Sequence, residues 1–173
     1  MERDYDGDSR IFQADLRDAQ DIGTRAGERA LARLDARKPP TGGYPVLFDE
    51  RIAASLIGHL LGAINGQAIS RGASFLRDAM CEQVLPEGLS LIEDPTRIRA
   101  TGSRPFDAEG LPTQQRAIVE KGILPGWTLD LANARKLAAA PHGNAAPGTG
   151  PGPQRSNWNH AQPQAHRSRH DPR

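Results

Sequence analysis

The sequence predicts an α+β fold of amphipathic helices and short, mostly antiparallel strands, followed by a disordered tail. Two segments carry apolar residues at spacings of three and four, which is the pattern of an amphipathic helix. Several short apolar runs end at glycine, proline or aspartate, as strands do. The last 33 residues hold six prolines and four glycines and almost no large aliphatic side chains. Such a tail cannot bury enough apolar surface to offset its loss of entropy on ordering.

The composition narrows the class of protein. A chain of 173 residues can bury one sizeable core, and a net charge of +1 gives no general reason to expect a nucleic-acid or acidic-membrane partner. The single cysteine cannot form an internal disulfide, which fits a reducing compartment. No apolar run reaches the roughly 18 residues of a membrane helix, and the charged N-terminus lacks the apolar segment of a secretion signal. We therefore expect a cytoplasmic protein with no membrane partner.

For the N-terminal part, residues 1–43, the sequence predicts a short strand or an extended lead-in, followed by one helix. Residues 1–15 are polar with scattered apolar positions. The helical stripe covers residues 16–37 and ends before the prolines at 39 and 40, because proline disfavours helical geometry in the residue before it. After a Thr-Gly-Gly turn, the apolar run at 44–48 predicts a buried strand.

A second amphipathic helix is predicted over residues 51–64, with Asp49 as its N-terminal cap. One face is aliphatic, and the opposite face carries small residues: Ser55, Gly58, Gly62 and Gly66. Glycine costs about 1 kcal/mol per helical position relative to alanine, so this face indicates that another segment passes very close to the backbone. A weakly formed helix end is the alternative.

After this helix, the sequence predicts a strand, a hairpin and a short helix. The strand is expected at 89–92, the hairpin at 116–120 with 123–131, and the helix at 132–139. Between the two arms of the hairpin lies Lys121-Gly122, where glycine supplies the positive φ of a tight turn.

The tail, residues 141–173, is expected to be a solvated coil. His166 and His170 are four residues apart, but prolines flank them and arginines separate them, so only adventitious metal binding is expected there. The tail's arginines could give weak, salt-sensitive contact with nucleic acid, and no specific recognition is expected because Trp158 is its only aromatic residue.

A series of short motifs carries a family resemblance. In order they are Arg71-Gly72-Ala73-Ser74-Phe75, Glu82-Gln83-Val84, the run from Gly102 to Asp107, Glu109-Gly110 and Gly143-Asn144. In this order and spacing, the chain resembles the TldD/PmbA family of zinc metallopeptidases, and within it the PmbA (TldE) side. The resemblance implies that residues 1–140 are part of a β-rich, peptidase-like C-terminal domain whose core is 44–140.

The resemblance also implies what this chain lacks. Catalytic members of the family carry a His-Glu-x-x-x-His motif on a helix, which supplies zinc ligands and a carboxylate that activates water. Counted back from Gly72, the motif falls on Ile57, Gly58 and Gly62, none of which can ligate a metal. We therefore expect no catalytic, cofactor-binding or metal-binding residue in this chain, and zinc only in a TldD-like partner.

Other reactive side chains have simpler structural interpretations. His59 lies at the edge of the aliphatic stripe and is expected to be partly buried and hydrogen-bonded. Cys81 has no neighbouring histidine to lower its pKa, so a buried or half-exposed, unreactive thiol is expected. Asp107 and Glu109 could hold a substrate or partner backbone, but a loop fixed by its own carboxylate hydrogen bonds is favoured.

By resemblance, this chain is expected to pair with a TldD-like protein subunit and to help form the cleft in which the complex cuts unfolded peptides. Members of the family also carry the label modulator of DNA gyrase. Full-length relatives continue before and after the matching region, so a truncated product with a frameshifted tail is expected, a native disordered tail being the alternative. A non-functional fragment and an independent metallopeptidase stay open as other functions. The sequence identifies neither the peptide substrate nor the partner.

Overall fold

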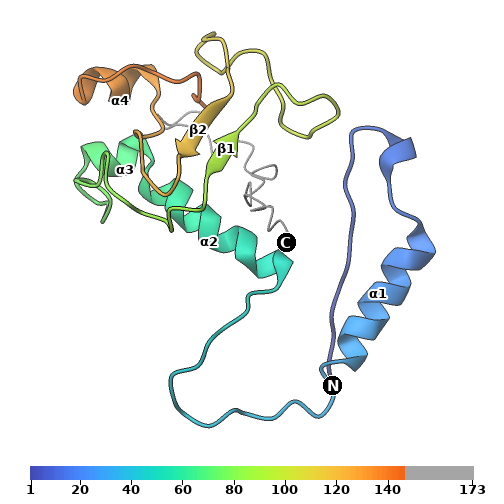
Figure 1. The fold of residues 1–173 in the computed structure, drawn as a ribbon. Helices are drawn as coiled ribbons and strands as arrows, with labels where there is room; N and C mark the ends of the chain where they lie inside the picture. Colours follow the sequence, from blue (N-terminus) through green and yellow to red (C-terminus); the bar gives the residue numbers. More distant parts are fainter. Residues whose placement is uncertain (147–173) are drawn as a thin grey trace, which may run out of the picture. The chain divides into compact units, whose positions relative to one another are not determined.

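The computed structural model describes residues 1–146 (Figure 1). These residues divide into two compact units. The first comprises residues 1–47 with 99–101, and the second comprises residues 48–98 with those from 102 onward. Helices combine with a small antiparallel sheet, so the predicted α+β class is confirmed. Most of the predicted tail, including His166 and His170, lies outside the described residues.

The first unit contains one helix of several turns. α1 (Ala19–Leu31) follows a short 3₁₀ turn, η1 (Gln13–Asp15). Asp18 caps α1, because its carboxylate accepts hydrogen bonds from two backbone N–H groups of the first turn. The helix predicted at 16–37 is therefore confirmed but shorter at both ends, since the cap sets its start and it ends well before the proline pair.

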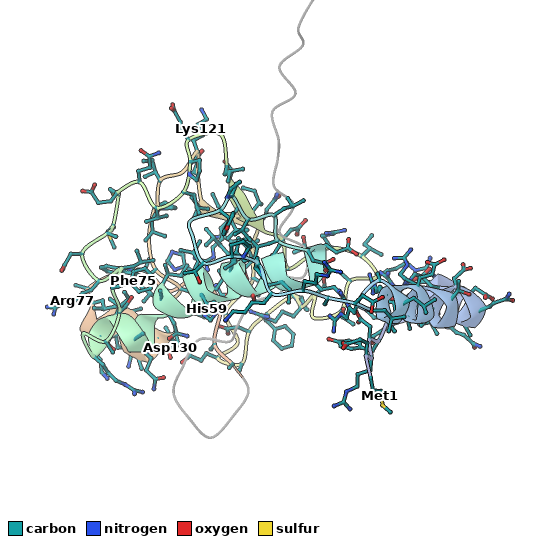
Figure 2. The ribbon with its side chains drawn as sticks, turned by 90° about the horizontal axis from the view of Figure 1, so that it is seen from below. Met1, His59, Phe75, Arg77, Lys121 and Asp130 are labelled. Atoms are coloured by element: carbon teal, nitrogen blue, oxygen red, sulfur yellow. The ribbon has the colours of Figure 1, made fainter. Side chains whose placement is uncertain are left out.

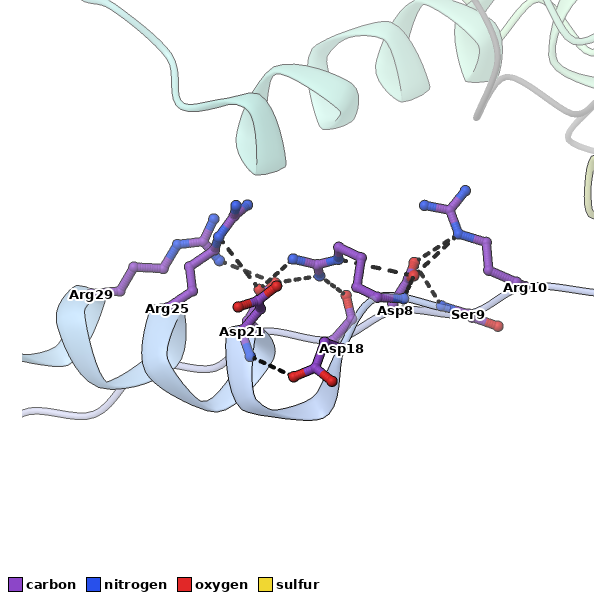
Figure 3. A network of polar contacts seen from close by, with 10 residues as sticks. Asp8, Ser9, Arg10, Asp18, Asp21, Arg25 and Arg29 are labelled. Carbon is purple, nitrogen blue, oxygen red and sulfur yellow. Dashed lines mark hydrogen bonds and ion pairs between the residues drawn. The ribbon is translucent and has the colours of Figure 1, made fainter. Parts of the chain in front are cut away.

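Charge pairs rather than apolar packing stabilise the first unit, because no residue of α1 is buried. Arg17 donates a hydrogen bond of 2.8 Å to the Asp6 carboxylate, and Arg29 lies 3.3 Å from the same group. The Arg17 backbone N–H donates to Asp8, whose carboxylate also pairs with Arg10 at 3.0 Å (Figure 3). The Asp6 and Asp8 side chains are only 10 % and 9 % exposed. The carboxylates of Asp6 and Asp8 thus hold the N-terminal segment against α1 and the residues that precede it.

Acid is expected to unfold this unit. The hydrogen bond from the Arg17 guanidinium holds the pKa of Asp6 well below its ordinary value of 3.8. The Arg17 backbone N–H, followed by Arg10, lowers the pKa of Asp8. Because both pKa values are lower in the folded state, the stabilisation is complete at neutral pH and is lost as the pH falls below 3.8.

The measurement is the NMR signal of the α1 amides between pH 7 and pH 2. Asp6→Asn should weaken α1 already at pH 7 and flatten its response to acid, whereas Glu2→Gln, at an exposed position, should change neither. An α1 signal that is equally strong at pH 2 would contradict the stabilising role of the carboxylates.

In the second unit, α2 (Glu50–Ala63) begins at the predicted cap, Asp49, whose carboxylate accepts from the backbone N–H of Arg51. A second helix, α3 (Gly66–Ser70), follows directly (Figure 1). Only the C-terminal end of α2 enters the apolar core. The buried core residues are Leu61, Ala63, Ile64, Leu76, Leu91, Ile118, Val119 and Leu124. Even α2, with 14 residues, is too short to cross a membrane, and no other described helix is long and apolar enough to do so.

The sheet of the second unit has two strands. β1 (Leu91–Glu93) pairs with β2 (Arg116–Val119) in antiparallel orientation, so strands are confirmed near both predicted positions. The pairing differs from the prediction, because β2 was expected to pair with residues 123–131. The short helix predicted at 132–139 is confirmed as α4 (Leu131–Lys136).

The predicted hairpin is reduced to its turn. Glu120 and Ile123 form a single bridge around Lys121 and Gly122, whose φ values are 47° and 84°. Beyond the turn, the chain bonds to a different neighbour: the Cys81 N–H donates to the Leu124 carbonyl, and residues 84 and 85 donate to that of Gly122. These competing backbone bonds explain why the second arm does not continue the ladder.

The buried strand predicted at 44–48 is absent. Tyr44, Val46, Leu47 and Phe48 are all exposed. A strand needs a neighbour to satisfy its backbone N–H and C=O groups, and no strand within residues 1–146 pairs with this segment. The segment is apolar, but apolar composition alone does not provide a neighbouring strand.

The close approach predicted for the small-residue face is present at one of its four positions. A Cβ added to Gly58 or Gly62 would meet nothing within 4 Å. A Cβ at Gly66, which lies beyond the end of α2, would come within 2.6 Å of Leu129 Cδ2. The position of a tight contact therefore depends on the Gly66 N–H bond to the Thr128 carbonyl, which the sequence pattern does not reveal.

This difference predicts opposite effects of alanine at two glycines. Gly62→Ala is expected to raise the free energy of unfolding by about 0.5–1 kcal/mol, because alanine is the better helix former and its methyl group meets open space. Gly66→Ala should lower it, since the methyl group would overlap Leu129. Urea denaturation measures both. Destabilisation by Gly62→Ala would show that a segment does pack against this face.

Candidate functional site

A buried ion pair joins the two strands. The antiparallel register places Glu93 of β1 opposite Arg116 of β2. Arg116 Nε donates to Glu93 Oε2 at 2.8 Å, and Arg116 Nη2 donates to the Thr128 hydroxyl at 2.8 Å. The Glu93 and Arg116 side chains are 3 % and 12 % exposed. Because both charges are largely removed from water, each depends on the other for compensation.

His142 lies close enough to this pair for its pKa to respond to both charges. Burial lowers the pKa of His142 below its ordinary value of 6.5, Arg116 lowers it further, and Glu93 acts in the opposite direction. The neutral imidazole is therefore favoured in the folded state. As the pH falls below 6.5, the unfolded chain binds a proton at His142 before the folded chain does. The free energy of unfolding therefore decreases in acid. Neither His142 Nδ1 nor Glu93 Oε1 has a hydrogen-bond partner among the described residues.

Next to this cluster, the acidic loop is fixed by its own carboxylates. Asp107 Oδ1 accepts from the backbone N–H groups of Glu109 and Leu111, and Oδ2 accepts from that of Ala145, all at 2.9 Å. Asp107 is 4 % exposed. Glu109 Oε2 accepts at 2.9 Å from the N–H of Leu131, where α4 begins. This geometry agrees with the structural interpretation of the loop, since the Asp107 carboxylate is already occupied.

Two of the sequence motifs meet in space. Arg104 Nη2 donates to Asn144 Oδ1 at 3.2 Å, and Asn144 is 2 % exposed. Gly143 has a φ of +66°, and a Cβ there would lie 2.6 Å from the Pro112 carbonyl oxygen, so only glycine fits. The Gly-Asn motif is therefore packed against the loop that begins at Gly102.

The hydrogen bonds and ion pairs of these polar residues fix loops, but they do not form a zinc site. The α2 positions that correspond to a His-Glu-x-x-x-His motif carry Ile57, Gly58 and Gly62, which offer no ligand. Within residues 1–146, no three His, Cys, Asp or Glu side chains are grouped so that they could hold a metal ion together. The described residues therefore do not offer a set of ligands that fits a catalytic zinc ion.

His59 and Cys81 are both more exposed than expected. His59 lies on α2 (Figure 2), but its side chain is exposed and makes no hydrogen bond within the described part of the chain, because this half of the helix is only partly covered. Cys81 is exposed with a φ of +64°, and its backbone N–H donates to Leu124 at 2.8 Å. The position of Cys81 is set by its backbone, and neither residue belongs to the polar cluster.

Three members of the cluster were not anticipated from the sequence: Glu93, Arg116 and His142. A usable signal was present for two of them. Glu93 ends one apolar run and Arg116 begins another, so opposite charges at these strand ends suggest an antiparallel pair. The predicted hairpin instead paired the segment of Arg116 with residues 123–131.

Comparison with known proteins gives consistent matches. A family model described as the PmbA/TldA metallopeptidase C-terminal domain matches residues 41–169. Metalloprotease PmbA of Escherichia coli O157:H7 is 39 % identical over 145 residues, which cover 84 % of this chain and 32 % of the relative. The metalloprotease TldD homolog of Buchnera aphidicola subsp. Schizaphis graminum is 30 % identical over 116 residues, covering 66 % of this chain and 24 % of the relative.

Solved structures agree in fold. A candidate modulator of DNA gyrase from Bacteroides thetaiotaomicron superimposes with a TM-score of 0.72 at 32 % identity, covering 77 % of this chain and 30 % of that chain. The chain thus spans about a third of the length of the curated relatives and structures that it matches.

Proposed function

Because this chain belongs to the PmbA/TldD metallopeptidase family, we propose that it acts as a PmbA/TldE-like subunit that pairs with a TldD-like subunit. In this proposal the partner holds the zinc ion, and the pair cuts unfolded peptides in the cytoplasm. This chain helps shape the substrate cleft without contacting the bond that is broken. It covers a third of its relatives' length, so the activity of the whole protein is part of the proposal.

The sequence of α2 is the observation that carries the proposal. A zinc peptidase needs imidazole ligands and a carboxylate that activates the bound water. Ile57, Gly58 and Gly62 supply none of these groups. Relatives on both sides of the family support a paired arrangement, and the identity is higher to PmbA, at 39 %, than to the TldD homolog, at 30 %.

An exposed apolar patch at the start of α2 supports pairing. Ile52 and Leu56 are 54 % and 47 % exposed and lie one helical turn apart, and Phe48, which precedes the cap Asp49, is 47 % exposed. Apolar side chains gathered in this way are typical of surfaces that another protein covers. We therefore place the contact with the TldD-like subunit on the N-terminal half of α2.

Co-expression with a TldD-like subunit tests the proposal. The two proteins are expected to co-purify in equal amounts. Leu56→Asp should abolish co-purification, because it puts a charge into an apolar contact. The neighbouring, exposed Ser55→Asp is the matched control and should leave pairing intact. Failure of the unaltered chain to pair would contradict the subunit role, whereas normal pairing of Leu56→Asp would contradict only the placement on α2.

A further inference from the structure

A pocket of about 370 Å³ opens beside α3, and nothing in the proposed function uses it. Its wall includes the segment that follows α3, which contains the Arg71-Gly72 part of the sequence motif. Ile69, Trp127 and Leu137 provide its larger apolar side chains, and Arg71, Arg77 and Asp78 provide its charges. The lining of the pocket is therefore more polar than apolar, and it carries a net positive charge.

The two guanidinium groups are not committed to other partners. Arg71 makes no side-chain hydrogen bond or ion pair within residues 1–146. Arg77 lies 4.0 Å from Asp78, at the limit of an ion pair, and these side chains are 62 % and 96 % exposed. Such an exposed, distant pair contributes little, so both arginines are available to a ligand.

The backbone at Gly72 brings these arginines together. Gly72 has a φ of +70°, which glycine adopts without strain. Arg77 Nη1 lies 3.3 Å from the position that a Cβ of Gly72 would occupy, so the guanidinium rests against this turn, directly beside Arg71 in the chain. Figure 2 shows Arg77 at this end of the second unit, with Phe75 close to it. Arg71 and Arg77 thus both line the same pocket.

We propose that this pocket binds the C-terminal carboxylate of a peptide whose last residue is apolar. Guanidinium groups bind carboxylates through paired, charge-assisted hydrogen bonds. Trp127 and Leu137, which are both partly exposed, provide most of the apolar surface for the last side chain, because Ile69 is only 3 % exposed. A volume of about 370 Å³ lies at the small end of ligand pockets, which suits a terminal residue better than a long segment. The inference goes beyond the proposed function, because it assigns a ligand to this chain alone.

Trp127 provides the test. The full chain has two tryptophans, so Trp158→Phe leaves Trp127 as the only fluorescent indole. This protein is titrated with N-acetyl-Ala-Leu as the free acid, with the corresponding amide, with N-acetyl-Ala-Glu amide and with inorganic phosphate. The free acid should bind about tenfold more tightly than the other three probes, and less tightly as salt is added. Calorimetry repeats each titration independently of fluorescence.

Two variants assign the binding to the pocket. Arg71→Gln and Arg77→Gln should each weaken binding of the free acid by about fivefold or more. Arg97→Gln changes an exposed arginine of the second unit outside the pocket and should leave binding unchanged. Circular dichroism verifies that the variants fold. Equal binding of acid and amide overturns the proposal, as does equal binding of phosphate or of the glutamate amide. Absence of binding by both methods, or equal affinities of the three variants, also overturns it.

Discussion

Arg116→Met is expected to lower the free energy of unfolding of the second unit by about 3–5 kcal/mol, because it leaves the Glu93 carboxylate buried without its counter-charge. Glu93 is only 4 % exposed, and Arg116 also donates to Thr128, so a polar bond is lost as well. Urea denaturation followed by Trp127 fluorescence, in the Trp158→Phe background, measures the change. The same variant should raise the pKa of His142, since Arg116 is one of the causes that lower it, and NMR titration measures that shift.

Two controls separate the ion pair from general damage. The double variant Glu93→Met, Arg116→Met should recover most of the lost stability, because an apolar pair of similar volume leaves no buried charge. Arg97→Met, at an exposed arginine of the same unit, should change stability by less than about 0.5 kcal/mol. If Arg116→Met were as stable as Arg97→Met, the pair would not be buried as described.

Gly122→Ala is expected to cost about 3 kcal/mol or more, the second large effect. Gly122 has a φ of +84°, and a Cβ would overlap the Leu85 carbonyl oxygen and come within 3.0 Å of the Pro86 carbonyl group. These neighbours are backbone and also form part of the hydrogen bonding around the turn, since the Leu85 N–H donates to the Gly122 carbonyl. Neither strain nor overlap can be relieved by a side-chain rotation. The same urea denaturation measures the loss.

Gly110→Ala is the matched control. Gly110 has a similar φ of +79°, but a Cβ there would meet nothing within 4 Å. Its cost should be limited to the left-handed conformation, about 1–2 kcal/mol. The difference between the two variants therefore isolates the overlap with residues 85 and 86. Equal losses would show that the close approach at Gly122 does not exist.

The helices could be predicted because their signals are local. Asp18 and Asp49 cap α1 and α2 through backbone N–H groups two or three residues away, and aspartate at such positions is visible in the sequence. The Lys121-Gly122 turn is equally local. These elements form for reasons contained within a few neighbouring residues, so their starts could be predicted closely. The end of α1 lies six residues before the predicted one, and the short helix α3 was not predicted.

Pairing and close packing could not be predicted in the same way. β2 pairs with β1, about two dozen residues earlier in the sequence, because residues 122–124 bond to the segment around Cys81 and Val84. The small-residue pattern suggested a contact that is present at Gly66, beside Leu129, and not at Gly58 or Gly62. Each outcome depends on which distant segment bonds to or packs against a given backbone group in the folded chain, and a local pattern contains no such information.

The candidate site shows the same division. Asp107 could be assigned a structural role from its loop, since its partners at Glu109 and Leu111 are near in sequence. The cluster of Glu93, Arg116 and His142 joins segments far apart in the chain and becomes visible only once β1 and β2 are paired.

Zinc content tests the central claim most directly. His160, His166 and His170 are first replaced with alanine, which removes the histidines of the tail after residue 146 as adventitious metal ligands. The chain is then purified alone and together with a TldD-like subunit, and both samples are examined by elemental analysis and peptide hydrolysis. We expect no retained zinc and no hydrolysis for the chain alone, and about one zinc ion per pair, held by the partner, together with hydrolysis. A tightly held zinc ion and peptide cleavage in the chain alone would contradict the claim that α2 offers no metal site.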